Sequence, residues 1–248
     1  MLQNRLMLLS FLLLSFLYNC KAIGNTFQPI EGFDKKTNER LERFFLETKN
    51  YDKRKIAVFD GDGTVVGQAP HYMADECLYE VAKANPQKKA DVIQKMTKLS
   101  NVSMEYVQLR VKFFEGDTVE YLRDLGAKCY HTHYAGKVFK PMVNLIGALK
   151  DNGFEVWIIT ASPEALYQKF LSEELHIKNT NIVGVKSVVH EGKITGTMIE
   201  PIPQDHGKKE AIETFVQERP LLVGGNSRGD KEMIEYSGNL KLIINPDE

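Results

Sequence analysis

Two aspartates spaced one residue apart are the residues of this chain best suited to chemistry. Asp60 and Asp62 follow the short apolar segment 55–59, and Gly61 and Gly63 alternate with them. Such a segment is typical of a buried β-strand, so carboxylates at its end lose hydration unless a cation compensates them. Oxygen atoms of this kind are the ligands that Mg²⁺ prefers. The alternative is an Asp/Gly turn between two strands, which these residue types also favour.

A hydroxyl group follows a second apolar segment, 154–160. Thr160 ends this predicted strand, and Pro163 begins the helix predicted after it. Because a hydroxyl beside a helix N-terminus can donate to a phosphate oxygen, we assign Thr160 to phosphate binding. We assign Ser162 to capping the helix, since serine is among the preferred capping residues.

A basic pair, Lys208 and Lys209, begins a later predicted helix. A lysine directed toward the carboxylates would balance their charge and hold a phosphoryl group. The alternative is two solvated lysines, although cations at a helix N-terminus oppose the helix dipole. Lys208 precedes the apolar Ile212 by four residues and so lies on the inward face, which is why we prefer it to Lys209.

A polar, glycine-rich loop carries Asn226 and Asp230 after the apolar segment 221–224. Alone, it could be an ordinary strand-to-helix connection in which Asp230 caps the helix. The aspartate pair, Thr160 and this loop each follow a predicted strand. In parallel sheets, ligands bind at the carboxyl ends of the strands, so these groups are expected to meet there.

Strands and helices alternate along most of the chain, as judged from apolar runs and helical periodicity. The predicted strands are 55–59, 154–160, two within 182–198, 221–224 and 240–244; the predicted helices are 37–49, several within 72–150, 164–175, 208–217 and 230–236. This order predicts an α/β fold, with a Rossmann-like, mostly parallel sheet covered by helices on both faces. A small all-helical cap, inserted after the first strand, is expected to sit over the carboxyl ends of the strands.

The same pattern divides the chain into four parts. Residues 1–20 are a signal peptide or lipoprotein signal, and 21–65 hold the N-terminal helix and the first core strand. The helical cap occupies 66–145, and the remainder of the catalytic core occupies 146–248.

The four groups, in this order and at these strand ends, resemble the motifs of the haloacid dehalogenase superfamily. The inserted cap resembles that of its phosphoserine-phosphatase-like branch, and the resemblance covers roughly residues 55–245. It implies a Mg²⁺-dependent phosphomonoesterase acting on a small phosphorylated metabolite. By this resemblance Asp60 attacks phosphorus and forms an aspartyl-phosphate, while Asp62 protonates the leaving alcohol and then activates water. The implied phosphate-binding residues are Thr160 and Lys208, and the implied metal ligands are Asp60, Asp62 through its carbonyl, Asn226 and Asp230.

Two positions depart from the family pattern. The fourth motif usually begins with an aspartate, whereas Asn226 stands there in this chain and adds no charge to a metal site. Phosphoserine phosphatases place a glutamate shortly after the first motif, and segment 67–72 has none, which argues against specificity for phosphoserine. Dehalogenases lack the second aspartate, so Asp62 disfavours dehalogenation.

The cap is rich in aromatic residues: Tyr72, Tyr79, Tyr106, Phe113 and Phe114. Such rings could hold a phosphocholine-type substrate through cation–π contacts. The interpretation that we favour is that they fill the core of the cap.

The N-terminus favours export. A basic start precedes the apolar run 6–18, which is too short to span a membrane comfortably. We expect a periplasmic protein, or a lipoprotein anchored through a lipid on Cys20. An uncleaved anchor and a cleavage near Ala22 are the alternatives. Beyond this segment Cys77 and Cys129 either pair or remain two buried thiols, and their spacing suits no zinc site.

The composition excludes one class of partner. The 248 residues carry a net charge of -1 with no long run of one sign, so a basic surface for nucleic acid is not expected. An exported, non-catalytic module of the same fold that binds phosphate and Mg²⁺ is the alternative function. The Asp60/Asp62 pair argues against it, because binding alone needs no acid beside the nucleophile.

Overall fold

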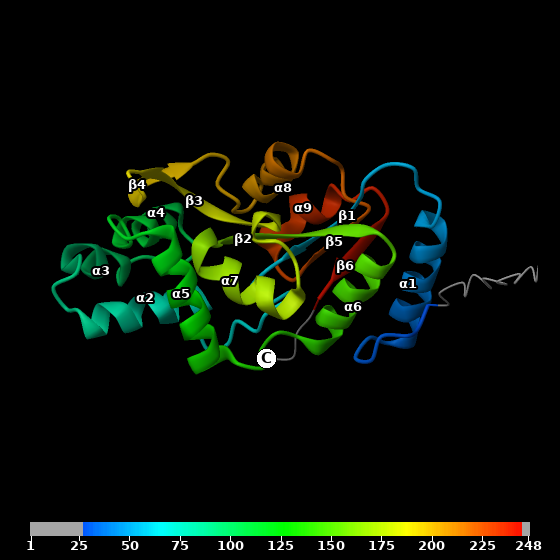
Figure 1. The fold of residues 1–248 in the computed structure, drawn as a ribbon, viewed down its shortest axis with the longest axis horizontal. Coiled ribbons are helices and arrows are strands. Elements are labelled where there is room, and N and C mark those ends of the chain that lie inside the picture. Colours follow the sequence, from blue (N-terminus) through cyan, green and yellow to red (C-terminus); the bar gives the residue numbers. More distant parts are fainter. Residues whose placement is uncertain (1–26, 245–248) are drawn as a thin grey trace, which may run out of the picture.

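The computed structural model describes residues 27–244, which fold around a six-stranded sheet (Figure 1). The strand order is β4-β3-β2-β1-β5-β6; β4 runs antiparallel to β3, and the other neighbours pair in parallel. The strands are β1 (Lys55–Asp60), β2 (Phe154–Pro163), β3 (Ile182–His190), β4 (Lys193–Ile199), β5 (Leu222–Gly225) and β6 (Leu240–Ile243). The predicted mostly parallel sheet is confirmed.

Helices cover both faces of this sheet. The core elements are α1 (Lys35–Thr48), α6 (Lys140–Asp151), α7 (Glu164–Leu175), η2 (Asn179–Asn181), α8 (Gly207–Ala211), η3 (Ile212–Val216), η4 (Arg228–Asp230) and α9 (Lys231–Glu235). Alternate residues of β1 face opposite ways, so Ala57 and Phe59 join the core under α1, α6 and α7. Ile56 and Val58 join the second core, under α8, η3 and α9. The Rossmann-like α/β fold is therefore confirmed.

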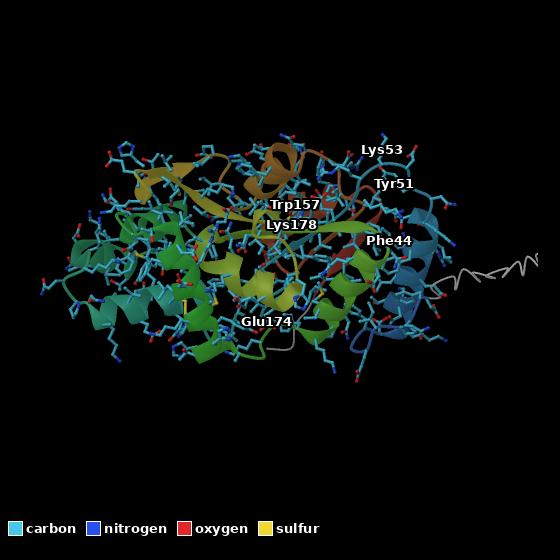
Figure 2. All side chains as sticks on the ribbon, viewed as in Figure 1. Phe44, Tyr51, Lys53, Trp157, Glu174 and Lys178 are labelled. Carbon is cyan, nitrogen blue, oxygen red and sulfur yellow. A yellow bond between two sulfur atoms is a disulfide. The ribbon has the colours of Figure 1, made fainter. Side chains whose placement is uncertain are left out.

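Aromatic packing fixes α1 against the sheet. Phe44 is fully buried, and its ring lies 5.3 Å from that of Phe154 at the start of β2. Figure 2 places Phe44 on the inner side of α1, toward the sheet. The helical periodicity of this segment therefore reflects real burial, as predicted.

The insertion between β1 and β2 is helical and extends beyond one end of the sheet (Figure 1). Its elements are α2 (Met73–Ala84), α3 (Ala90–Met96), α4 (Met104–Phe113), α5 (Val119–Cys129) and the π-helical turn η1 (Tyr130–Tyr134). A disulfide joins Cys77 on α2 to Cys129 at the end of α5, which settles the choice between a bridge and two free thiols. Tyr106, Phe113 and Phe114 fill the core of the cap, as favoured from the sequence, and Tyr79 is partly buried against it. The prediction is wrong for Tyr72, which lines a cavity instead.

Three boundaries differ from the prediction. Strand β2 continues to Pro163, three residues past the predicted end, with a register shift against β3 between Ile159 and Pro163. The predicted helix 208–217 is an α-helix that gives way to a π-helical segment at Ile212. The predicted domain boundary at residue 145 falls inside α6, a helix that packs on the sheet.

The N-terminal predictions lie outside the described residues. This applies to the signal at 1–20, to lipidation at Cys20 and to a cut near Ala22. Within residues 27–244, no helix is both long enough and apolar enough to cross a membrane.

Candidate functional site

The end of β1 places the first aspartate in a buried position. Asp60 is only 4 % exposed, and its Oδ2 accepts a hydrogen bond from the Thr64 hydroxyl at 3.1 Å. The chain then turns through Gly63, whose φ of +81° is a conformation that glycine adopts without strain. A Cβ on Gly63 would lie 2.1 Å from the side chain of Asn226, so the absence of a side chain here leaves room for the loop after β5.

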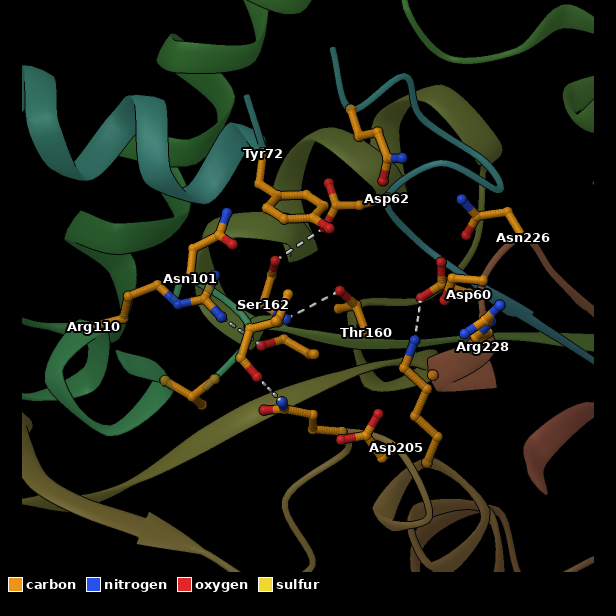
Figure 3. Close-up of a pocket in the computed structure, with 18 residues that line it drawn as sticks. Asp60, Asp62, Tyr72, Asn101, Arg110, Thr160, Ser162, Asp205, Asn226 and Arg228 are labelled. Atoms are coloured by element: carbon orange, nitrogen blue, oxygen red, sulfur yellow. Dashed lines mark hydrogen bonds and ion pairs between the residues drawn. The ribbon is translucent and has the colours of Figure 1, made fainter. Parts of the chain in front are cut away.

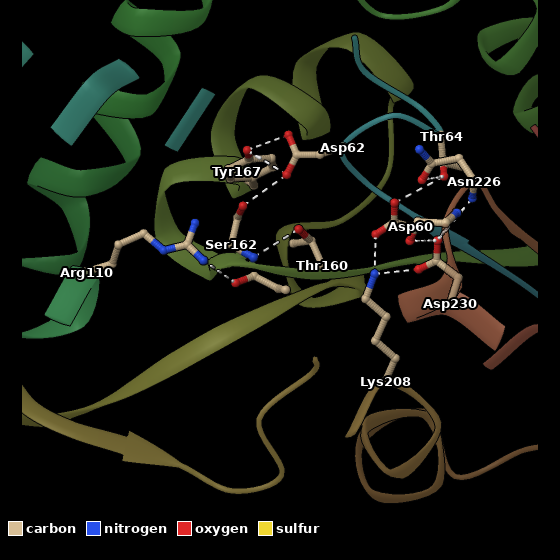
Figure 4. A network of polar contacts seen from close by, with 12 residues as sticks. Asp60, Asp62, Thr64, Arg110, Thr160, Ser162, Tyr167, Lys208, Asn226 and Asp230 are labelled. Atoms are coloured by element: carbon tan, nitrogen blue, oxygen red, sulfur yellow. Dashed lines mark hydrogen bonds and ion pairs between the residues drawn. The ribbon is translucent and has the colours of Figure 1, made fainter. Parts of the chain in front are cut away.

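Lys208 joins two carboxylates from different strand ends. Its Nζ lies 2.6 Å from Asp60 Oδ1 and 2.6 Å from Asp230 Oδ1 (Figure 4). Lys208 is buried, whereas Lys209 is partly exposed and pairs with Glu213 in η3. The inward placement of Lys208, inferred from its spacing to an apolar residue, is confirmed.

Burial and this ion pairing set the charge states of the cluster. Burial raises the pKa of Asp60 to about 6, although Lys208 acts in the opposite direction. Burial alone would lower the pKa of Lys208, but Asp60 and Asp230 hold that pKa above its ordinary value. For Asp230 burial acts to raise the pKa, and Lys208 with the Ser227 hydrogen bonds brings it below the ordinary value. Lys208 therefore stays cationic at neutral pH.

Asp230 organises the loop after β5. Its Oδ2 accepts hydrogen bonds from the backbone N–H groups of Asn226 and Ser227, at 3.0 and 2.9 Å, and from the Ser227 hydroxyl at 2.9 Å. The carboxylate is fully buried, with Lys208 on its other oxygen. Its predicted role as a metal ligand stays a prediction, and its observed contacts hold the loop and Lys208 in place.

Asn226 presents its amide to oxygen atoms of β1 and the turn after it. In the orientation that satisfies its hydrogen bonds, the amide nitrogen donates to the Thr64 hydroxyl at 3.2 Å and to Asp60 Oδ2 and the Asp62 carbonyl oxygen at 3.3 Å each. No cluster of three His, Cys, Asp or Glu side chains suited to a metal exists in the described part of the chain. A cation here could use the Asp60 carboxylate and the Asp62 carbonyl oxygen, and rotation of the Asn226 amide would add its oxygen; this donor set fits Mg²⁺.

The second aspartate has a different set of partners. The Tyr167 hydroxyl donates to Asp62 at 2.7 Å from Oδ1 and 2.9 Å from Oδ2, and the Ser162 hydroxyl donates to Oδ2 at 3.0 Å. Burial raises the pKa of Asp62, against these hydrogen bonds. The assignment of Ser162 to helix capping is wrong, because the longer β2 makes Pro163 the residue that precedes α7.

Thr160 lies between the two aspartates in the network of Figure 4. It is buried, and its Oγ1 accepts a hydrogen bond from the Ser162 backbone N–H at 3.1 Å. The hydroxyl proton stays available to an acceptor, since a hydroxyl both accepts and donates. The structure thus brings together all the residues predicted for the site.

A cavity of about 340 Å³ adjoins these residues, and Arg110 of the cap reaches it. Its guanidinium donates to the Ala161 carbonyl oxygen at 3.2 Å, and its Nε has no hydrogen-bond partner. Figure 3 shows Arg110 at the opposite end of the site from Asn226 and Arg228. Helix α4 therefore lies over the carboxyl ends of the strands, as the cap prediction requires.

Sequence reasoning missed Arg110 and Tyr167. Both lie on helices, where periodicity indicates which face is buried but not which distant residue the face contacts. One signal was present for Tyr167, since it falls among the buried Leu166, Phe170 and Leu171 and a buried tyrosine hydroxyl needs a partner.

Comparison with known proteins decides the family. The family model described as haloacid dehalogenase-like hydrolase matches residues 57–235, which include β1, the cap, β2 and the loop after β5. The chain belongs to the haloacid dehalogenase-like hydrolase family. The resemblance drawn from the four motifs is therefore confirmed.

Individual relatives of this hydrolase are distant. A putative hydrolase of Mycobacterium leprae is 27% identical over 140 residues, covering 54% of this chain and 45% of the relative. Phosphoserine phosphatase SerB1 of Mycobacterium tuberculosis is 27% identical over 140 residues, covering 54% of this chain and 44% of the relative. The match thus spans less than half the length of these curated relatives.

A solved structure supports the same fold over most of the chain. A functionally unknown protein from Anaerococcus prevotii superimposes with a TM-score of 0.68 at 15% identity, covering 87% of each chain. At such identity the likeness shows the fold alone.

Proposed function

We propose that this family member is a phosphomonoesterase that acts on a small phosphorylated metabolite through an aspartyl-phosphate. The observation that carries the proposal is the pairing of two differently supported carboxylates at one strand end. Asp60 is paired with the buried Lys208, and Asp62 is held by two neutral hydroxyls. A nucleophile and a proton donor need such different surroundings, and here they are two residues apart.

The proposed reaction has two steps. In the first, a carboxylate oxygen of Asp60 bonds to phosphorus, the bond from phosphorus to the leaving oxygen breaks, and Asp62 gives that oxygen its proton. In the second, Asp62 takes a proton from water, the water oxygen bonds to phosphorus, and Asp60 is released as a carboxylate. Lys208 and the Thr160 hydroxyl are placed to bind phosphoryl oxygens.

Mg²⁺ is the proposed cofactor. Asp60, the carbonyl oxygen of Asp62 and the Asn226 amide would hold it, and Asp230 supports the loop that carries Asn226. When bound, the ion supplies the positive charge that lets an anionic nucleophile approach an anionic substrate. That charge would offset the carboxylates of Asp60 and Asp230, which share the single cation Lys208.

The cavity favours a substrate with a second anionic group. Arg110 is buried at the cap end of the cavity, where it lies 3.7 Å from Asp75, and its Nε has no hydrogen-bond partner. A carboxylate or second phosphate on the substrate would add hydrogen bonds to this guanidinium. Phosphoserine, the compound named in the description of the mycobacterial relative, has such a group. Tyr72 also borders the cavity, so phosphocholine belongs in the same comparison.

Export is part of the proposal. The disulfide between Cys77 and Cys129 is of a kind that persists in oxidising compartments, and the N-terminal sequence has the form of a secretion signal. Incorporation of labelled palmitate that is lost in Cys20→Ala would establish a lipoprotein, and a cytoplasmic location of the full chain would contradict export.

The test of the function is release of inorganic phosphate from phosphoserine, phosphocholine and sugar phosphates with Mg²⁺. We expect turnover by the wild type, none by Asp60→Asn, and wild-type rates for Asp52→Asn, which alters an exposed aspartate before β1. Absence of turnover on the whole panel contradicts the proposal. Binding of phosphate and Mg²⁺ without turnover would instead establish the non-catalytic module.

A further inference from the structure

The carboxylate of Asp62 is enclosed by hydroxyl donors that no family motif predicted. We propose that Tyr167 and Ser162 are positioning residues that fix this carboxylate for proton transfer, an inference that rests on the proposed function. Tyr167 donates to both oxygens, at 2.7 and 2.9 Å, and Ser162 donates to Oδ2 at 3.0 Å. Figure 4 shows both hydroxyls directed at Asp62.

Tyr167 is anchored firmly enough to hold a partner in place. Its side chain is fully buried on α7, and its ring packs 5.4 Å from the ring of Phe170 one turn later. A buried hydroxyl without a partner is strongly unfavourable, so the Tyr167 hydroxyl and the Asp62 carboxylate stabilise each other's orientation.

The cap helix α5 fixes the backbone beside Tyr167. A Cβ placed on Gly126 of α5 would lie 1.9 Å from the carbonyl oxygen of Leu166, so the two helices touch through their backbones. Arg123 and Asp124 of α5 also contact Gln168 and Lys169, the two residues that follow Tyr167 on α7. The hydroxyl of Tyr167 therefore projects from a rigid support.

Without these donors the carboxylate of Asp62 could adopt other orientations. Lys208 and Arg110 both act on Asp62 electrostatically, and an unrestrained carboxylate would turn toward one of these cations. In either position it would leave the path between the leaving oxygen and the attacking water. The two hydroxyls carry no charge, so they hold the side chain of Asp62 without placing a cation beside it.

The predicted consequence depends on the leaving group. Tyr167 and Ser162 gain and lose no proton overall, and they act only through Asp62. An alkyl phosphate needs a proton on its leaving oxygen, whereas p-nitrophenolate leaves without one. Loss of positioning should therefore slow formation of the aspartyl-phosphate from alkyl phosphates and spare its formation from p-nitrophenyl phosphate.

The experiment compares Tyr167→Phe and Ser162→Ala with wild type on phosphoserine and p-nitrophenyl phosphate, each with Mg²⁺. In Tyr167→Phe we expect kcat/KM on phosphoserine to fall by about 10- to 100-fold and kcat/KM on p-nitrophenyl phosphate to change by less than about 3-fold. A burst of p-nitrophenol should appear, because Asp62 must also activate the water that hydrolyses the intermediate. Ser162→Ala should show the same pattern with a smaller loss.

The control is Tyr130→Phe, which removes a buried hydroxyl packed on the same helix. The Tyr130 ring stacks 4.7 Å from that of Phe170, away from Asp62, and this variant should match wild type on both substrates. Equal losses on both substrates, or no loss on phosphoserine, in both site variants would overturn the inference while wild-type turnover keeps the proposed function. An inactive wild type would overturn both. If Tyr167→Phe unfolds, as thermal melting reports, Ser162→Ala decides.

Discussion

Asp60 and Asp62 are two residues apart, yet the structure surrounds them with different chemistry. Asp60 is buried, and its closest partner is the cation Lys208, which also binds Asp230. Asp62 is partly open to the cavity, and its partners are the neutral hydroxyls of Tyr167 and Ser162. Residues two apart in a strand face the same side, so the turn after β1 must redirect the second carboxylate. Asp60 ends β1 and meets Lys208 of α8, whereas Asp62 lies in the turn and meets Tyr167 of α7.

This difference explains how one short motif can supply both a nucleophile and a group that transfers protons. A cation beside a carboxylate favours its ionised form, as a nucleophile requires. The hydroxyl donors orient the Asp62 carboxylate and favour its ionised form, but burial raises its pKa against them, as a group that both gives and takes a proton requires. Separate environments for two nearby acids are a general sign of separate tasks.

Replacement of each aspartate by its amide should cause the largest losses of activity. Asp60→Asn should lose at least about 10⁴-fold in kcat, because no nucleophile remains. Asp62→Asn should lose about 10²- to 10⁴-fold, since only proton transfer is removed. With p-nitrophenyl phosphate, Asp62→Asn should give a burst of p-nitrophenol and Asp60→Asn should give none. Equal bursts in the two variants would show that the roles are not divided in this way.

Replacement of Lys208, the cation beside Asp60, should cause the next largest loss of activity. Lys208→Met should lower kcat by about 10²- to 10³-fold, because it removes a preorganised charge from the phosphoryl site. Lys209→Met alters the neighbouring, partly exposed lysine, whose surface ion pair with Glu213 contributes little, so its activity should stay within about 2-fold of wild type. Steady-state rates of both variants check this, and a similar loss in both would contradict the assignment to Lys208.

Most of the residues around Asp60 could be predicted from the sequence. Apolar runs located the strands, parallel strands place their carboxyl ends together, and a four-residue spacing set Lys208 inward. Strand ends are local features, so the residues that follow them could be assigned without tertiary information.

The Asp62 side could not be predicted in the same way. Tyr167 reaches Asp62 across 105 positions of sequence, and helical periodicity does not name the partner of a buried face. Ser162 was misassigned because the irregular end of β2 extends the strand past Thr160. No residue type in this segment predicts that extension. The pairing of Cys77 with Cys129 likewise depends on a Cα separation of 5.7 Å that the spacing does not reveal.

The pH dependence of stability should separate Asp60 from its surroundings in the metal-free protein. Folding raises its pKa from 3.8 to about 6, so the folded state keeps this proton to higher pH than the unfolded state. The stabilisation is complete below pH 3.8 and is lost as pH rises toward 6. Relative to Asp60→Asn, wild type should lose up to about 3 kcal/mol of unfolding free energy across this window. Urea unfolding in EDTA measures it, and parallel curves for the two proteins would contradict the raised pKa.

Asn226 gives the smallest effect and bears on how the Asp60 side accepts a metal. Its amide lies 3.3 Å from Asp60 Oδ2, so Asn226→Asp adds a second negative charge at that distance. Repulsion should lower the melting temperature of the metal-free protein, and Mg²⁺ should bind about 10-fold more tightly, a change of about 1.4 kcal/mol. Asn50→Asp, which adds the same charge at an exposed position before β1, should change neither quantity. Calorimetric titration with Mg²⁺ measures the affinity, and an unchanged or weaker affinity would mean that Asn226 does not face the ion. In that case the carboxylate of Asp60 and the Asp62 carbonyl would hold the metal without the loop after β5.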